Sequence, residues 1–160
     1  LYAMEQYYEH PVVSVDDDAV YLVNFPELLY RKWWECDGEH RNIIVTNVPN
    51  VKTGGVKVPN GYCTFYPHGC LGGALDMMTP RIVGTNNDDT YYGTILTARN
   101  YEFEYLHMAG KIATFVEDGL GLGENGMYRA GNADLEVIVS ELRKRRDFVP
   151  MNELFKRKWS

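Results

Sequence analysis

The sequence predicts a single α+β domain, in which a small antiparallel sheet with a β-hairpin is packed by two to three helices. Three observations support this fold class. The 160 residues suffice for one compact domain and are too few for two comfortable ones. Apolar residues make up 45% of the chain and charged residues 24%, which is typical of a globular protein. Short runs of β-favouring residues fall within 42–99, and helical patterns lie on either side of them.

The domain is expected to span residues 1–160 and to carry an arm at each end. Residues 1–10 are expected to form a short helix or an ordered arm, and residues 148–160 a C-terminal arm with a last short helix after Pro150. The segment PVVSV near the N-terminus favours a strand. The next segment, DDDAVYLVNF, is compatible with either a capped helix start or a turn.

The first well-supported element is a helix over residues 26–36. Pro26 suits a first helical position, and Glu27 suits the positive end of the helix dipole. Apolar side chains recur at a spacing of four residues, and the chain then reaches a glycine that suits a helix stop. These residues are Leu29 with Trp33, Tyr30 with Trp34, and Gly38.

The sheet is expected from residues 42–99. RNIIVTNVPN is typical of a buried strand that ends at Pro49, and YCTFYP is a second short β-favouring run. VKTGGVKVPNG is expected to be a turn-rich connection, and HGCLGGALDMMTP an irregular loop. In TPRIVGTNNDDTYYGTILTAR, two runs rich in β-branched and aromatic residues flank the turn formers Asn86 to Asp89, which is the signature of a hairpin.

Two further helices are expected, over residues 101–118 and 133–147. The segment YEFEY alternates as a strand does, but the longer window that follows has helical spacing, and the longer signal favours a helix. ADLEVIVSELRKRR is the best helical pattern in the chain, and four basic residues follow its apolar stripe. The stripe consists of Leu135, Ile138, Val139 and Leu142.

The hairpin turn has a competing interpretation as a carboxylate site. Asp88 and Asp89 are adjacent, so in a strand they would point to opposite faces. Their spacing does not match a calcium-binding loop. Asn and Asp are also the residues that a tight turn selects. The turn is therefore the preferred interpretation.

Cysteine and histidine residues give an alternative metal site, although no metal is the primary expectation. Thiolate and imidazole groups suit tetrahedral zinc, but the spacing matches no familiar zinc motif. The candidate ligands are Cys36, His40, Cys63, His68 and Cys70. The enzymatic variant of this idea is a Cys70 nucleophile with His68, His40 or His107 as its base. Buried cysteines that behave as small hydrophobes are the simpler interpretation of Cys36 and Cys63.

Two other patterns receive less weight. An acidic two-metal centre would draw on Asp16 to Asp18 with Glu117 and Asp118, although such charges at element ends are more often solvated caps. GLGENG, residues 121–126, matches the glycine pattern of dinucleotide sites but lacks the surrounding βαβ pattern, so a loop is expected there.

Charge distribution points to protein partners. The net charge of −6 disfavours nucleic acid as the main partner, since phosphate binding rests on a positive surface. No apolar run approaches the roughly 18 residues of a membrane helix, so no membrane partner is expected. Residues 136–160 hold seven Lys or Arg against four Asp or Glu, whereas the remaining chain is acidic. This basic segment predicts an interface for self-association or for a larger complex, formed by Arg143, Arg145, Arg146, Phe148, Phe155 and Trp159.

Aromatic residues also suit an interface. They make up 13% of the chain, and tyrosine, with twelve copies, combines an apolar ring with a polar tip. Five tyrosines lie in segments that are expected at the surface: Tyr7, Tyr8, Tyr91, Tyr92 and Tyr128.

The function expected from the sequence is that of a non-catalytic structural or interaction subunit in a larger multi-copy assembly, virion-like or of another kind, with no cofactor. The alternative is a small hydrolase that uses a Cys/His site, with or without zinc, or a carboxylate–metal site. Removal of residues 148–160 is expected to break assembly and nothing else. An odd cysteine count of three favours a reducing location, the cytoplasm or a virion-like particle. A secreted form left by a cleaved signal peptide stays open, because the chain begins with Leu1.

Overall fold

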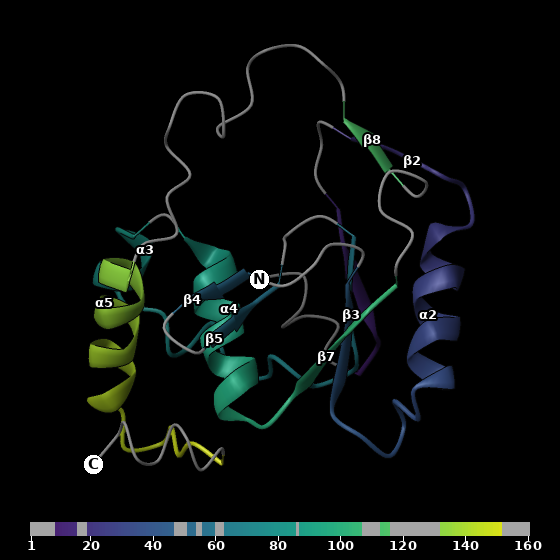
Figure 1. Cartoon of the computed structure of the whole chain (residues 1–160). Coiled ribbons are helices and arrows are strands. Elements are labelled where there is room, and N and C mark those ends of the chain that lie inside the picture. The colour runs from purple at the N-terminus through teal and green to yellow at the C-terminus, as the bar shows by residue number, and fades with distance from the viewer. Residues whose placement is uncertain are drawn as a thin grey trace.

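A four-stranded mixed sheet lies between helices in the structure, a computed structural model that describes residues 9–15, 19–46, 51–53, 56–59, 63–85, 87–106, 113–115 and 132–151 (Figure 1). The strand order is β1 (Val12–Ser14), β6 (Thr64–Tyr66), β3 (Ile43–Thr46) and β7 (Glu102–Tyr105). β6 pairs with both β1 and β3 in the antiparallel sense, and β3 pairs with β7 in the parallel sense. The α+β fold class predicted from the sequence is confirmed.

One face of this sheet packs against α2 (Phe25–Glu35). Side chains of a strand alternate between faces, so Ile43 and Val45 of β3 point the same way. They belong to one buried cluster with Leu29 and Trp33 of α2. The expected helix over 26–36 is confirmed, and its four-residue spacing of apolar side chains places its buried stripe on the sheet.

The opposite face packs against a second, larger core. Ile44 of β3, Tyr66 of β6 and Phe103 of β7 join a cluster that contains most of the apolar side chains of α4 (Asp88–Ala98). The β4 (Val51–Thr53) and β5 (Val56–Val58) strands pair in the antiparallel sense, and β5 lies against α4.

An outer layer consists of α3 (Pro80–Val83) and α5 (Asn132–Arg143), and the layers from α2 through the sheet and α4 to α5 follow one another in Figure 1. The apolar stripe predicted for α5 is confirmed, because Leu135, Ile138 and Leu142 are buried. The helix ends at Arg143, four residues before the expected limit. Beside the N-terminal end of α2, β2 (Ala19–Tyr21) pairs with β8 (Ala113–Phe115) in the antiparallel sense (Figure 1). No helix in the described ranges is both long and apolar enough to cross a membrane.

The predicted hairpin over residues 79–99 is wrong, because this segment forms α3 and α4. Asn87 is the N-cap of α4, and its side-chain oxygen accepts the backbone N–H of Thr90 at 3.1 Å. Asp88 and Asp89 occupy the first turn, where the helix dipole favours negative charge. Three of the predicted turn residues, Asn87, Asp88 and Asp89, thus form a helix start, and Asn86 lies outside the described residues. Tyr91 and Tyr92, expected at the surface, are buried in α4.

The far end of α4 closes with a left-handed residue. Asn100 has φ 68°, and its N–H bonds to the carbonyl of Thr97 at 3.1 Å. The N–H of Tyr101 then bonds to the carbonyl of Leu96 at 2.9 Å, which completes a Schellman motif. This stop turns the chain directly into β7.

The predicted helix over residues 101–118 is also wrong. Residues 102–105 form β7, and residues 113–115 form β8. The alternation in YEFEY is the true signal, since Phe103 is buried and Glu102 is exposed. Pairing with buried β3 therefore decides the conformation of this segment. It also makes the sheet mixed, where an antiparallel sheet was expected.

Candidate functional site

The three cysteines are free thiols that lie in different parts of the fold. Cys70 belongs to the large core around α4, and Cys63 lies in a small cluster near Tyr21. Cys36 packs beside the core under α2. Within the ranges that the structure covers, no group of three or more His, Cys, Asp or Glu side chains could hold a metal ion.

The proposed Cys–His pair does not have the properties of a nucleophile and its base. Burial raises the pKa of the Cys70 thiol to about 12, so it stays protonated at neutral pH. His68 is exposed, two residues away in the chain. His40 is also exposed and lies 4.0 Å from the carboxylate of Asp37. His107 falls outside the described residues.

The remaining carboxylate and glycine patterns lie mostly outside the described part of the chain. This applies to Asp16 to Asp18, to residues 117–118 and to residues 121–126. Asp88 and Asp89 are described, and they serve as the first turn of α4.

One arginine of the basic segment at the end of α5 is engaged in hydrogen bonds within the domain. Arg145 donates two hydrogen bonds to the carboxylate of Asp147, at 2.9 and 2.7 Å, and a third to the carbonyl of Asp76 at 2.8 Å. Arg143 and Arg146 are exposed. Phe155 and Trp159 lie outside the described residues.

Phe148 does not lie on the surface as expected, because its side chain is buried in the large core. Pro150 is buried too, and the N–H of Met151 bonds to the carbonyl of Ala98 at 2.7 Å. Residues 148–151 therefore belong to the folded domain. Their removal is expected to open the core, so loss of residues 148–160 should affect the fold as well as any assembly.

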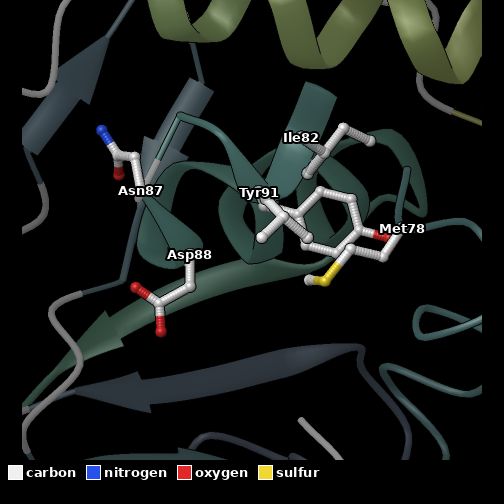
Figure 2. Close-up of a pocket in the computed structure, with 6 residues that line it drawn as sticks. Met78, Ile82, Asn87, Asp88 and Tyr91 are labelled. Carbon is white, nitrogen blue, oxygen red and sulfur yellow. The ribbon is translucent and has the colours of Figure 1, made fainter. Parts of the chain in front are cut away.

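A cavity lies beside the N-terminal end of α4, and Figure 2 shows Asn87 and Asp88 on one side of it and Met78, Ile82 and Tyr91 on the other. Its volume is about 290 Å³, and Val83 completes its lining. Apolar side chains and two polar residues, Asn87 and Asp88, thus line one small space. The sequence did not indicate this site, because its lining comes from α3, from the start of α4 and from Met78 before α3, and the packing of these segments is not visible in any local pattern.

A second candidate site is a set of exposed apolar side chains around β2 and α2. In the described ranges, ten large apolar residues are exposed, and five of them fall between residues 20 and 34. We call these five residues the α2 surface: Val20, Leu22, Val23, Tyr30 and Trp34. Trp34 is 57% exposed and Tyr30 is 44% exposed, which is high for rings of this size.

The two rings of the α2 surface are held by buried neighbours. The ring centroids of Tyr30 and Trp34 are 6.4 Å apart, and that of Trp33 lies 5.7 Å from Tyr30. Trp33 in turn contacts Phe65 of the sheet at 5.5 Å between centroids. Its indole also lies on Gly38, where a β-carbon would come within 2.2 Å of Nε1. The rings therefore stand on a packed base.

The spacing of aromatic residues in the sequence is a signal for this surface, although it was used above only to predict the helix. Two pairs of aromatic or apolar residues at a spacing of four lie one position apart, Leu29 with Trp33 and Tyr30 with Trp34. A helix on one face of a sheet buries one such stripe and exposes part of the next. The spacing therefore allows the prediction that one of the two pairs is exposed.

Comparison with protein-family models, with curated proteins and with solved structures found no match for this chain.

Proposed function

We propose that the chain is a non-catalytic interaction subunit that associates with copies of itself in a larger, multi-copy assembly. The observation that carries this proposal is the α2 surface. Tyr and Trp are enriched at the centres of protein interfaces, because they bury a large area with few side-chain torsions to fix. Tyr30 and Trp34 are exposed on a rigid base, so little side-chain freedom remains to be lost when they become buried.

The charge around α2 supports a second copy as the occupant. The charged residues of α2 are Glu27, Arg31, Lys32 and Glu35, two of each sign. Glu27 and Arg31 form an ion pair at 2.6 Å. The whole chain carries −6, so most approaches between two copies meet repulsion. An approach through α2 brings together two helices whose own charges cancel.

The hydrolase alternative has less support. It needs an ionised thiol or a cluster of metal ligands, and Cys70 is a buried, protonated thiol. We propose further that the protein works in a reducing location, the cytoplasm or a virion-like particle, in which free Cys36, Cys63 and Cys70 persist.

Sedimentation velocity over a dilution series tests the proposal. The wild-type chain is expected to shift to a larger species as concentration rises, and the double variant Tyr30→Ala/Trp34→Ala is expected to stay monomeric. Val149→Ala removes another exposed apolar side chain, at the end of the domain next to α5, and is the matched control. Far-UV circular dichroism checks that each variant is folded. Association that survives in the double variant, or a monomeric wild type at every concentration, would contradict the proposal.

A further inference from the structure

Building on the self-association proposed above, we infer that two copies of the chain dock through the α2 surface in an antiparallel arrangement about a twofold axis. Four exposed side chains of α2 lie at spacings of three and four residues, so they form one stripe along the helix. The stripe consists of Glu27, Tyr30, Arg31 and Trp34. Charged and aromatic side chains therefore alternate along one exposed face of α2.

The end of the α2 surface that precedes the helix is aliphatic. Leu22 and Val23 come directly before Asn24, the N-cap of α2. The N–H of Phe25 bonds to the carbonyl of Leu22 at 3.1 Å, so this turn is held against the start of the helix. Val23 is fully exposed. Trp34 lies in the last turn of α2, at the opposite end of the helix from β2 (Figure 1).

The stripe complements its own reverse. In an antiparallel pair that sets Glu27 of each copy opposite Arg31 of the other, the twofold axis passes midway between these two residues. Trp34 lies five residues beyond that level and Val23 six residues before it, so each Trp34 falls opposite the aliphatic turn of the second copy. The two Tyr30 rings lie beside the axis. One register thus pairs opposite charges and apolar groups at the same time.

A parallel pair has the opposite result. It sets Glu27 opposite Glu27 and Arg31 opposite Arg31, and like charges that face each other across an interface oppose association. The ends of the helix dipole also favour the antiparallel pair, because it places the positive end of each helix beside the negative end of the other. The order of charges along α2 therefore selects one direction of docking.

A twofold contact buries the same surface on both copies, so that surface is used up once two copies have met. The α2 surface is therefore expected to join copies in pairs. A larger assembly built through it is expected to contain an even number of copies.

Photocrosslinking of the full chain distinguishes the two directions. Trp34→p-benzoylphenylalanine keeps a large aromatic side chain and forms a covalent bond with a neighbouring chain on irradiation. Mixing ¹⁵N-labelled and unlabelled copies identifies the products that join two chains. Crosslinks from position 34 to residues 20–24 of the second copy are expected. Val149→p-benzoylphenylalanine, at another exposed apolar position, is the matched control and should give no product between copies.

Charge reversal tests the register independently. Glu27→Lys places like charges opposite each other in the antiparallel pair, so the dissociation constant is expected to rise about tenfold. Glu27→Lys/Arg31→Glu restores opposite charges and is expected to return the constant to within about twofold of the wild type. In a parallel pair, Glu27→Lys would replace one like-charge contact with another and leave the constant as it was. Glu136→Lys makes the same charge change on α5 and should have no effect.

Far-UV circular dichroism checks that each variant is folded. Crosslinks from position 34 to residues 33–37 of the second copy would overturn the antiparallel geometry and leave self-association standing. An unchanged dissociation constant in Glu27→Lys would do the same. A wild type that stays monomeric, with no product between copies at any concentration, would instead contradict the self-association on which this geometry rests.

Discussion

Gly93 of α4 lies so close to Lys57 of β5 that a β-carbon on Gly93 would come within 2.5 Å of the Lys57 carbonyl oxygen. The same β-carbon would lie 3.0 Å from the Cα of Val58. Contacts this short to backbone are not relieved by a side-chain rotation. The missing side chain therefore lets a buried helix lie directly on a strand.

Gly93→Ala is expected to lower the free energy of unfolding by about 1 to 3 kcal/mol, because the added methyl group forces α4 away from β5. Urea denaturation followed by circular dichroism measures the change. Gly84→Ala is the comparison, since its closest contact would be 3.3 Å. An equal or smaller loss in Gly93→Ala than in Gly84→Ala would mean that α4 does not approach β5 as described.

Asn87→Ala is expected to destabilise the protein by about 1 kcal/mol, because the N–H of Thr90 loses its cap. Asn87→Ser keeps a capping oxygen and should cost less than Asn87→Ala, although it loses the bond to Asp134. The thermal midpoints of the two variants give the comparison. If serine were no better than alanine, Asn87 would not act as a helix cap.

Glu141 ties α5 to α3, because its carboxylate accepts hydrogen bonds from Lys144, from Thr79 and from Arg81. The hydrogen bond from Lys144 is the largest cause that lowers the pKa of Glu141 below its usual 4.5, followed by that from Thr79 and the charges of Lys144 and Arg81. The resulting stabilisation is present above pH 4.5 and is lost as the pH falls through the lower, folded-state pKa.

Glu141→Gln should therefore lower the thermal midpoint at pH 7 and reduce the loss of stability that the wild type shows on acidification below pH 4.5. Thermal unfolding followed across this pH range measures both effects. Glu136→Gln, exposed on the same helix, should change neither. Identical pH profiles for wild type and Glu141→Gln would show that this contact contributes nothing to stability.

Alkaline pH should lower the stability of the fold, because several tyrosine hydroxyls and one thiol keep their protons in the folded state. Burial, with the charges of Asp89 and Cys70 as lesser causes, raises the pKa of Tyr66 well above 10.0. Burial raises the pKa of Cys70 from 9.0, and those of Tyr92 and Tyr101 from 10.0, to about 12. The unfolded chain releases these protons first, so the stability that these four groups contribute is full below pH 9 and falls between pH 9 and 12.

Tyr66→Phe should make this alkaline decline shallower, because one of the retained protons is absent. Urea midpoints measured between pH 8 and pH 11 give the slope. Tyr30→Phe, which changes an exposed ring, should leave the slope as in the wild type. A Tyr66→Phe slope equal to that of the wild type would contradict the assignment of Tyr66 to this decline.

The sequence predicted those elements whose burial matches a simple local pattern, either one apolar face or a short apolar run. Strand β3 and helices α2 and α5 have one buried face or full burial in a sheet, and their periodicity shows it. Helix α4 is buried nearly all round, from Asp89 to Leu96, so it has no polar face to give a helical period. Its many β-branched and aromatic residues then imitate strands, and tertiary packing overrides that propensity. Only Asn87 with its two following aspartates indicated a helix start.

The same limit applies to the sites. Periodicity could indicate an exposed pair such as Tyr30 and Trp34, because both belong to one helix. It could not show that Cys63 and Cys70 are buried in different clusters, or that Asp88 and Ile82 line the same cavity. Those relationships depend on which segments pack together, and local pattern does not encode that.

Hydrogen–deuterium exchange at several protein concentrations tests most directly whether the α2 surface joins copies of this chain. Exchange of backbone amides in residues 19–35 is expected to slow as the protein concentration rises, while exchange in α5 stays constant. The Tyr30→Ala/Trp34→Ala variant should lose this concentration dependence. Protection that grows in α5 and not in residues 19–35, or no protection in a sample shown to be oligomeric, would mean that copies of the chain do not associate through the α2 surface.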